Sequence, residues 1–320
     1  MNLRKLAWTC ALLGTFAPHL HAQTYPVRPI RMIVPAPPGG IIDVVGRLLG
    51  QKITEQTGQT VIIDNRTGGL TSVGSEMVAR SPGDGYTLLL QSLPMVINPA
   101  MLGKMSYDYE KDLAPVSLVV TSPYLLVAHP SVPARSVGEL IAIAKVEPGR
   151  ITYSSSGNAS NLHVAVELFA GMAGVKMLHI PYKGGGPALT AVLGGEADLS
   201  ALAVSAVMPQ VNAGRLRALA ITSLKRLPAL PRIPSAAETV PGYDFASWVG
   251  VLAPSATPPA LVNTINGIVV KAARAPDLVE RFSKDATDVV ANSPAEFQAF
   301  IQSEAKRWAK VVKDSGMRAD

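Results

Sequence analysis

Short apolar runs alternate with segments of helical periodicity along most of the chain. The run from Ile30 to Val34 predicts a strand, and the apolar positions between Val44 and Ile53 recur at the three- and four-residue spacing of a helix. Gly58 then predicts the helix end. Repeated strand and helix segments predict strand–helix–strand units, which favour an α/β fold with a parallel sheet.

The same pattern predicts the other elements. We expect further strands at residues 61–63, 86–90, 125–128, 151–153, 175–180, 199–204, 216–221 and 248–253. We expect further helices at 72–80, 136–145, 161–173 and 187–193, and after residues 257 and 293, with capping boxes at 136–139 and 293–296. Because the chain ends in helices, we expect two α/β lobes, with crossovers near 125–129 and 248–254.

The first 22 residues have the three-part plan of a secretory signal peptide. Arg4 and Lys5 precede an apolar stretch of 12 residues, from Leu6 to Ala17, and a small residue, Ala22, ends the segment. The apolar stretch is too short to span a bilayer. We therefore predict cleavage after Ala22 and export to the periplasm.

Composition narrows the class of protein. Of the 320 residues, 48% are hydrophobic and 16% are charged, a balance that excludes an intrinsically disordered chain. The net charge is +6, and removal of residues 1–22 leaves 27 basic against 23 acidic residues. The basic residues are scattered, so we expect no nucleic-acid partner. Cys10 lies in the predicted signal peptide, so no cysteine remains for a nucleophile, a disulfide or a metal site.

The sequence carries no recognisable catalytic constellation. It has no G-x-S-x-G elbow, no H-E-x-x-H motif and no P-loop. His129, His163 and His179 are dispersed, and each reads more readily as a structural histidine, although His163 directly follows a polar loop. We expect no enzymatic activity, no cofactor and no metal site.

One device recurs instead: an apolar strand ends, a loop of small residues follows, and a helix begins. It occurs at residues 35–42, 91–94, 154–161 and 183–186. Such loops expose backbone N–H groups, and a helix N-terminus adds about half a positive charge. In open α/β sheets ligands sit at the carboxyl ends of strands, so loops that face one another would cradle a small anion such as a carboxylate.

Single residues of these loops allow two interpretations. Asp43 is either a helix-start residue favoured by the dipole or an acceptor that orients the loop or a ligand-bound water. Lys183 is either a carboxylate partner or a solvated loop lysine. Each loop alone also suits an ordinary strand–helix connection.

The sequence resembles the Bug, or tripartite tricarboxylate transporter, substrate-binding proteins. The resemblance rests on YPVRPIRMIVP at 25–35 followed by Pro38, Gly39, Gly40 and Asp43, and on DGYTLL at 84–89. HIPYKG at 179–184, LRALAIT at 216–222 and WVGVLAP at 248–254 extend it over essentially all of the chain after residue 22.

The resemblance implies a type II periplasmic binding protein fold, in which two α/β lobes enclose a ligand cleft. We expect the first lobe at 23–124 and 248–320 and the second at 125–247. It further implies a monomer that captures a small carboxylate by lobe closure and delivers it to a membrane permease with a large and a small subunit. The alternative is a sensor component that presents the closed form to a membrane signalling protein.

Two departures from the family pattern bear on the ligand. Residues 67–70 differ from the family's usual glycine-rich run, so this turn is expected to differ. Leu202 stands where many family members carry a second acidic residue. The absence of that acid favours a plain or more apolar organic acid as the ligand over an amino acid. The expected ligand-binding residues are Pro38, Gly39, Gly40, Ile41, Asp43, Ser92, Ser155, Ser156, Gly157, Asn158, Ser160, His163, Lys183, Gly184, Gly185, Leu202 and Ala203.

Overall fold

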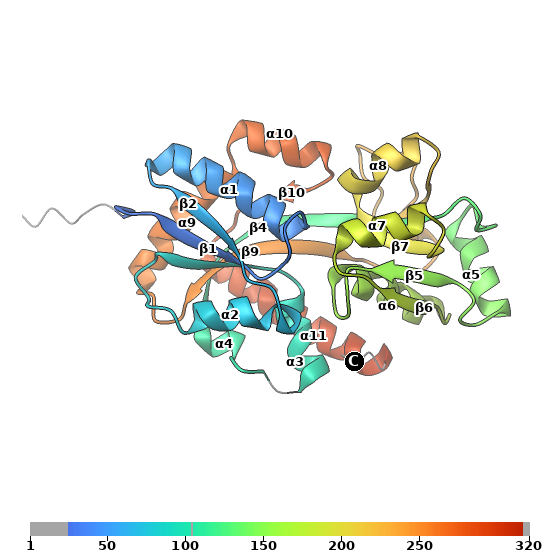
Figure 1. Ribbon diagram of the computed structural model, residues 1–320, viewed down its shortest axis with the longest axis horizontal. Coiled ribbons are helices and arrows are strands. Elements are labelled where there is room, and N and C mark those ends of the chain that lie inside the picture. Colours follow the sequence, from blue (N-terminus) through green and yellow to red (C-terminus); the bar gives the residue numbers. More distant parts are fainter. Residues whose placement is uncertain (1–24, 104, 316–320) are drawn as a thin grey trace, which may run out of the picture.

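A computed structural model describes residues 25–103 and 105–315 (Figure 1). The predicted signal peptide therefore lies outside the described residues. The chain begins with β1 (Ile30–Val34), α1 (Ile41–Thr57), β2 (Val61–Asn65), η1 (Gly69–Thr71), α2 (Ser72–Ala79), β3 (Thr87–Gln91), α3 (Pro94–Leu102) and α4 (Tyr109–Asp112). The strands and helices expected here are present, and α3 and α4 were not predicted.

The middle of the chain holds a long strand and a second set of strand–helix units. These are β4 (Leu113–Ala128), α5 (Val137–Val146), β5 (Thr152–Ser155), α6 (Asn161–Ala173), β6 (Leu178–Pro181), α7 (Gly185–Leu193), β7 (Leu199–Ala203), α8 (Val204–Asn212), β8 (Arg217–Ile221) and η2 (Ala236–Glu238). The chain then forms β9 (Ala246–Pro254), α9 (Pro259–Ala273), α10 (Pro276–Lys284), β10 (Asp288–Val289) and α11 (Pro294–Ser315).

The strands form one continuous sheet in the order β2-β1-β3-β9-β4-β7-β5-β6, and β8 and β10 also pair with β4. The β1–β2, β1–β3, β5–β6 and β5–β7 pairs are parallel, as expected from the strand–helix alternation. The expectation of a parallel sheet is wrong at its centre, where β4 and β9 run antiparallel to their neighbours. The reason is that β4 and β9 are the strands that pass between the two parts of the sheet, one in each direction. They are not joined to their neighbours by the helical crossovers that make strands parallel.

The sheet has two parts that share β4. In the first part, β4 pairs with β9 from Leu113 to Pro123, and in the second it pairs with β7 from Tyr124 to Ala128. Figure 1 shows β1, β2 and β3 at one end, β5, β6 and β7 at the other, and β4 and β9 between them. This is a mixed α/β fold of two lobes. The predicted boundaries between the lobes stay a prediction.

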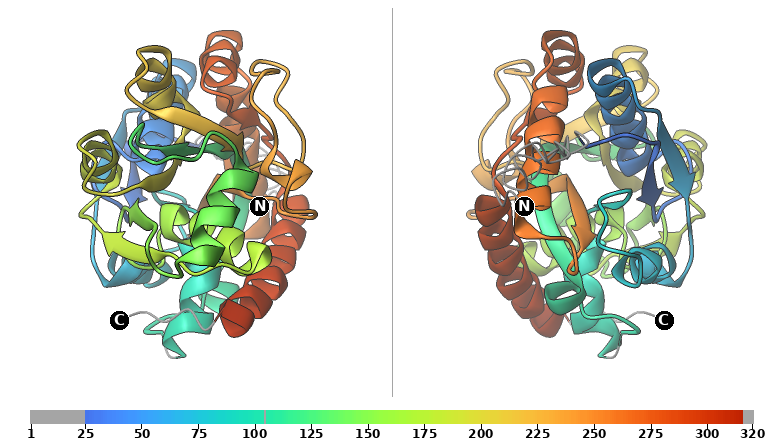
Figure 2. Two further views of the ribbon diagram at one scale, coloured as in Figure 1. Left: turned by 90° about the vertical axis from the view of Figure 1, so that its right-hand side faces the viewer. Right: turned by 90° about the vertical axis from the view of Figure 1, so that its left-hand side faces the viewer.

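The C-terminal helix ties these parts together. α11 packs against α3 and β4 and also contacts α6, along one flank of the molecule (Figure 2). The expected capping box opens it, because the Glu296 N–H donates to Ser293 Oγ and the Ser293 N–H donates to the Glu296 carboxylate. The indole of Trp308 is 1% exposed in the core beneath it. The packing of α11 therefore helps to fix the positions of the two parts of the sheet and of the loops at their strand ends.

Candidate anion-binding cavity between the two parts of the sheet

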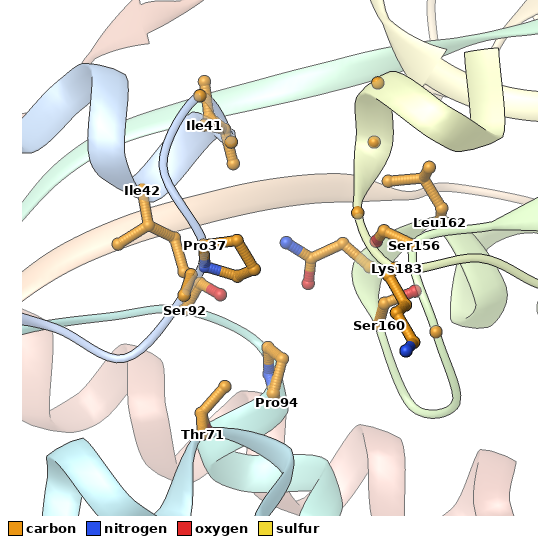
Figure 3. A pocket seen from close by; sticks show the side chains of 18 of the residues that line it. Pro37, Ile41, Ile42, Thr71, Ser92, Pro94, Ser156, Ser160, Leu162 and Lys183 are labelled. Atoms are coloured by element: carbon orange, nitrogen blue, oxygen red, sulfur yellow. The ribbon is translucent and has the colours of Figure 1, made fainter. Parts of the chain in front are cut away.

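A cavity of about 620 Å³ lies where the two parts of the sheet meet. One wall comes from the loops after β1, β2 and β3, and the other from the loops after β5, β6 and β7. Figure 3 shows Pro37, Ile42 and Ser92 on the first wall facing Ser156, Ser160 and Lys183 on the second. We call these the first wall and the second wall. The volume of the cavity is in the range of small-molecule pockets.

The structure brings most of the expected site residues to this cavity. The expected residues that line it are Pro38, Gly39, Gly40, Ile41, Ser92, Ser156, Gly157, Asn158, Ser160, Lys183, Gly184, Gly185, Leu202 and Ala203. Three expected residues, Asp43, Ser155 and His163, lie outside the lining and are buried behind it.

The N-terminal ends of six helices bound the cavity. The N-cap residues of α1, α2, α6, α7 and α8 and the first residue of α3 belong to its lining: Gly40, Thr71, Ser160, Gly184, Ala203 and Pro94. The first N–H groups of a helix have no partner within the helix, and the helix dipole places partial positive charge there. Among the described lining residues the only charged side chain is that of Lys183. The cavity is therefore positive mainly through the backbone.

Ser92 supplies a polar group without a protein partner. Ser92 lies between β3 and α3 and is fully buried. Its backbone N–H donates to Gln91 Oε1 at 2.8 Å. Its Oγ has no hydrogen-bond partner among the described residues. A buried hydroxyl without a partner is uncommon and calls for an explanation. Ser92 belongs to the cavity lining, and Figure 3 shows its side chain on the first wall beside Pro37.

Asp43 organises the first wall from behind. Its carboxylate accepts two hydrogen bonds from Arg47, one from the Gly39 N–H and one from Asn65 Nδ2, all at 2.9 Å. Burial alone would raise the pKa of the Asp43 carboxyl, but these hydrogen bonds outweigh it and hold the pKa below its usual range. A carboxylate has about four acceptor positions, so those of Asp43 are occupied by the protein itself. Asn65 also donates to the Ala36 carbonyl, which joins this loop to β2.

Two stacked histidines support the loop of the second wall. The rings of His163 and His179 are 3.9 Å apart and 5° from parallel, and Tyr153 stacks on His179 at 4.9 Å. The Ala159 N–H donates to His163 Nδ1 at 3.1 Å, and His179 Nε2 lies 2.6 Å from Ser155 Oγ. Ser155 Oγ in turn accepts from the Gly157 N–H.

These contacts fix the charge state of the pair. Because a backbone N–H donates to His163 Nδ1, the neutral ring carries its proton on Nε2. Burial and then the neighbouring His179 lower the pKa of His163 to about 3, and burial lowers the pKa of His179 to about 4. Both rings are therefore neutral near pH 7 and act as supports for residues 155–159, where Ala159 has a φ of 56°.

The structure adds lining residues that were not among the expected site residues. Eight of them lie in the four loops singled out in the sequence: Pro35, Ala36, Pro37, Ile42, Pro94, Ala159, Asn161 and Gly186. The others lie outside those loops: Thr67, Gly68, Leu70, Thr71, Tyr124, Leu162, Pro187, Leu189 and Ala206. Residues 67–71 were findable, because they connect a predicted strand to a predicted helix in the same way as the four loops that were singled out. Tyr124 carries no such signal, since it reaches the cavity only because β4 passes from one part of the sheet to the other.

The described residues offer neither a metal-binding cluster nor a membrane-spanning helix. Within 25–103 and 105–315, no group of three or more His, Cys, Asp or Glu side chains is placed to hold a metal ion. No helix in the described part of the chain is long and apolar enough to cross a membrane.

The fold and the cavity define a two-lobed α/β ligand-binding protein, and comparison with known proteins agrees. Residues 45–317 match the family described as "Tripartite tricarboxylate transporter family receptor". The chain belongs to this family.

Solved structures of relatives superimpose over most of the chain. Rpa4515 of R. palustris, solved with adipate, is 34% identical, with a TM-score of 0.86 over 92% of this chain and 99% of that one. The periplasmic binding protein BugD is 30% identical, with a TM-score of 0.84 over 92% and 99%. MatC from Rhodopseudomonas palustris, solved with malate, is 28% identical, with a TM-score of 0.83 over 90% and 100%. The resemblance to Bug proteins and the expected fold class are thereby confirmed.

Proposed function

We propose that this protein is a periplasmic receptor that captures a small organic acid anion in the cavity. The observation that carries the proposal is the meeting of six helix N-termini at one cavity whose described lining has a single charged side chain. Backbone dipoles that are fixed by the fold need no reorganisation when an anion enters. Adipate and malate in the related structures are ligands of this chemical class.

The expected residues on the two walls have complementary tasks in this proposal. Gly39 and Gly40 let the start of α1 approach the ligand closely, and Ser92 Oγ donates to a ligand oxygen. Ser156, Ser160 and the start of α7 supply donors from the opposite wall. Asp43, Ser155 and His163 hold the two walls in shape without touching the ligand. In this proposal the hydrogen-bond donors on each wall are positioned before the ligand binds. The ligand contacts both sets of donors when the walls approach each other.

Membership of the family supports a proposal for the cellular role. A receptor of a tripartite tricarboxylate transporter delivers its ligand to a membrane permease, and we propose this partner for the closed form. We also propose export with cleavage after Ala22. Mass spectrometry of the protein recovered from a periplasmic fraction is expected to show Gln23 as the first residue, and an uncleaved N-terminus would contradict this step.

A thermal-shift screen tests the proposed ligand class. Acetate, succinate, malate, adipate and citrate are compared with glucose and with MgCl₂ at matched ionic strength. A ligand at a hundredfold excess over its Kd stabilises the folded state by about 2.7 kcal/mol. We expect stabilisation by at least one carboxylate and none by glucose. Stabilisation by the sugar or the metal ion alone would overturn the proposal.

A further inference from the structure

We infer that one flank of the molecule is a docking surface for a membrane of anionic phospholipids. The flank consists of the loop between β8 and η2, residues 222–235, and the outer face of the C-terminal half of α11. We call it the basic flank. None of its charged residues belongs to the cavity lining, so this surface is separate from the proposed ligand site.

The basic flank holds the excess positive charge of the chain. Residues 225–232 include three basic residues and residues 305–313 include four, and neither segment contains an acidic residue. The rest of the chain after residue 22 has 20 basic and 23 acidic residues. The positive excess is therefore confined to two short segments that are far apart in the sequence.

The fold brings these two segments together at Asp244. The Leu224 N–H donates to Asp244 Oδ1 at 3.0 Å, and the Arg307 guanidinium donates to the Asp244 carbonyl. The rings of Phe245 and Trp308 also pack edge to face, with centroids 5.9 Å apart. Both views of Figure 2 show the gold loop after β8 on the same flank as the red α11. The two segments therefore form one continuous surface.

Two arginines of this surface are held by the protein, and the other cations face solvent. Arg226 donates two hydrogen bonds of 2.7 Å to the Glu238 carboxylate. Arg307 lies 3.6 Å from the Glu304 carboxylate. The remaining five basic residues are all exposed: Lys225, Arg232, Lys306, Lys310 and Lys313.

The three lysines of α11 form a line along its solvent side. Positions 306, 310 and 313 have the spacing of one helix face, and Trp308 is buried on the opposite face. The neighbouring positions on the outer face, 299, 302, 303 and 309, are Ala, Gln, Ser and Ala. Lys52 and Lys284, by contrast, each pair with a carboxylate three or four residues away on the same helix. The line on α11 therefore presents positive charge without acidic neighbours on that face.

A phospholipid surface fits this arrangement better than a single small anion. The cations are spread over a loop and a helix instead of converging on one point, and a membrane presents many anionic headgroups without a fixed geometry. Leu224 is 51% exposed and lies next to Lys225. An exposed apolar side chain beside cations suits the boundary between headgroups and acyl chains.

Vesicle co-sedimentation tests the inference. Protein that begins at residue 23 is used, because the apolar run at 6–17 would itself bind lipid and the described fold lies after residue 24. Vesicles of phosphatidylcholine alone are compared with vesicles of phosphatidylcholine and phosphatidylglycerol in equal parts. We expect at least about tenfold stronger binding to the anionic vesicles, and loss of most of that preference when the salt is raised from about 50 mM to about 300 mM.

Matched double substitutions locate the binding surface. Lys306→Gln with Lys313→Gln removes two charges from α11, and Lys225→Gln with Arg232→Gln removes two from the loop. Lys145→Gln with Lys176→Gln removes two exposed charges from α5 and from the segment before β6, and serves as control. We expect each flank pair to weaken binding to anionic vesicles at least about fivefold, and the control pair to weaken it less than about twofold. A thermal melt checks that all variants fold.

The exposed leucine provides a second test. Leu224→Ser leaves the charge unchanged and is expected to weaken binding to anionic vesicles at least about threefold, because an apolar side chain no longer enters the headgroup layer.

Three results would overturn the inference: no preference for anionic vesicles, equal losses in the control pair and the flank pairs, or unchanged binding in both flank pairs. If the flank variants bind vesicles normally but no longer support uptake by cells, the partner is an acidic protein surface and not lipid. The vesicle experiments contain no carboxylate ligand, so their failure leaves the proposed capture of an organic acid intact.

Discussion

Gly40 separates binding from folding at the scale of a single residue. Its φ of −77° suits any residue, and a Cβ there would meet only the Pro37 carbonyl oxygen, at 3.8 Å. It nevertheless lines the cavity at the start of α1. We expect Gly40→Val to abolish carboxylate binding, with at least about a hundredfold loss in affinity, because its side chain takes the space of the anion. Calorimetry and a thermal melt of the same sample check both parts.

Gly267 is the matched control for this substitution. It lies on the exposed side of α9, away from the cavity, and a Cβ there meets nothing within 4 Å. Gly267→Val is expected to leave affinity unchanged. If Gly40→Val binds normally, the loop after β1 is not part of the ligand site.

Lys183 tests how much of the attraction comes from formal charge. It is exposed at the edge of the second wall, where an ion pair with the ligand would be screened by water and salt. We expect Lys183→Met to weaken carboxylate binding only about threefold to tenfold and to flatten its dependence on salt concentration. Lys225→Met, at an exposed lysine that is not in the lining, serves as control. A loss comparable to that of Gly40→Val would show that the lysine, and not the backbone, dominates.

At the scale of elements, the histidine stack links α6 to β6 and makes stability depend on pH. The folded pKa values of about 3 for His163 and about 4 for His179 lie below the value of about 6.5 for an unfolded histidine. Between pH 6.5 and 4 the unfolded chain therefore binds more protons, and stability is lost as the pH falls. Each histidine contributes a slope of at most about 1.4 kcal/mol per pH unit.

Urea unfolding at pH 7, 6, 5 and 4 measures this slope. His163→Phe keeps an aromatic ring in the stack but removes the titrating group, so we expect a flatter dependence of the unfolding free energy on pH than in the unsubstituted protein. Carboxylate titrations are common to both proteins and cancel in the comparison. Equal slopes would contradict neutral burial of His163. The variant is also expected to bind carboxylates more weakly, because the Ala159 N–H loses its acceptor.

Elements with a clear apolar period were predictable, and those without one were not. α1 shows one buried face at helical spacing and was expected close to its observed position. α6 is buried on nearly all sides, and it was expected at its observed bounds because Leu162, Val166 and Phe169 keep the helical spacing. α3 was missed because its first five residues are all buried, so no polar face marks the helix, and Pro99 lies within it. α8 was not predicted, and only its first residue, Val204, was assigned, to the end of the preceding strand, since α8 follows β7 without a break and contains Pro209.

The candidate site was predictable to the extent that it is made of strand–loop–helix junctions. The chemistry of such loops is local, so residues 38–41 and 156–160 could be singled out from small and polar residues alone. The roles of Asp43 and His163 could not be assigned, because they depend on Arg47 and Asn65 in one case and on His179 in the other. Arg47 lies one turn after Asp43 on α1, but Asn65 comes from β2 and His179 from β6. Contacts of these last two residues are set by packing between elements and leave no trace in local sequence.

At the scale of the whole molecule, the continuous strand β4 connects the two walls of the cavity. It leaves the first part of the sheet after Pro123 and enters the second at Tyr124, which itself lines the cavity. Proline has no N–H, so Pro123 donates no hydrogen bond to a neighbouring strand at this point. The second connection runs from Thr222 to Phe245, which are joined by a backbone hydrogen bond. A rotation at these two places would move the walls together and leave each part of the sheet intact.

Small-angle X-ray scattering tests whether binding closes the molecule in this way. A compact chain of the 298 residues that follow Ala22 is expected to have a radius of gyration of about 19 Å, and separated lobes raise that value. We expect the radius to fall towards this value when the protein is saturated with the carboxylate that stabilises it most in the thermal-shift screen, because ligand contacts from both walls are completed only on closure. Gly40→Val in the same ligand solution should keep the radius of the free protein. A ligand that binds tightly without changing the radius would show that the walls already stand in their binding positions, and recognition by a permease would then have to depend on the ligand surface or on local loop changes instead of on lobe closure.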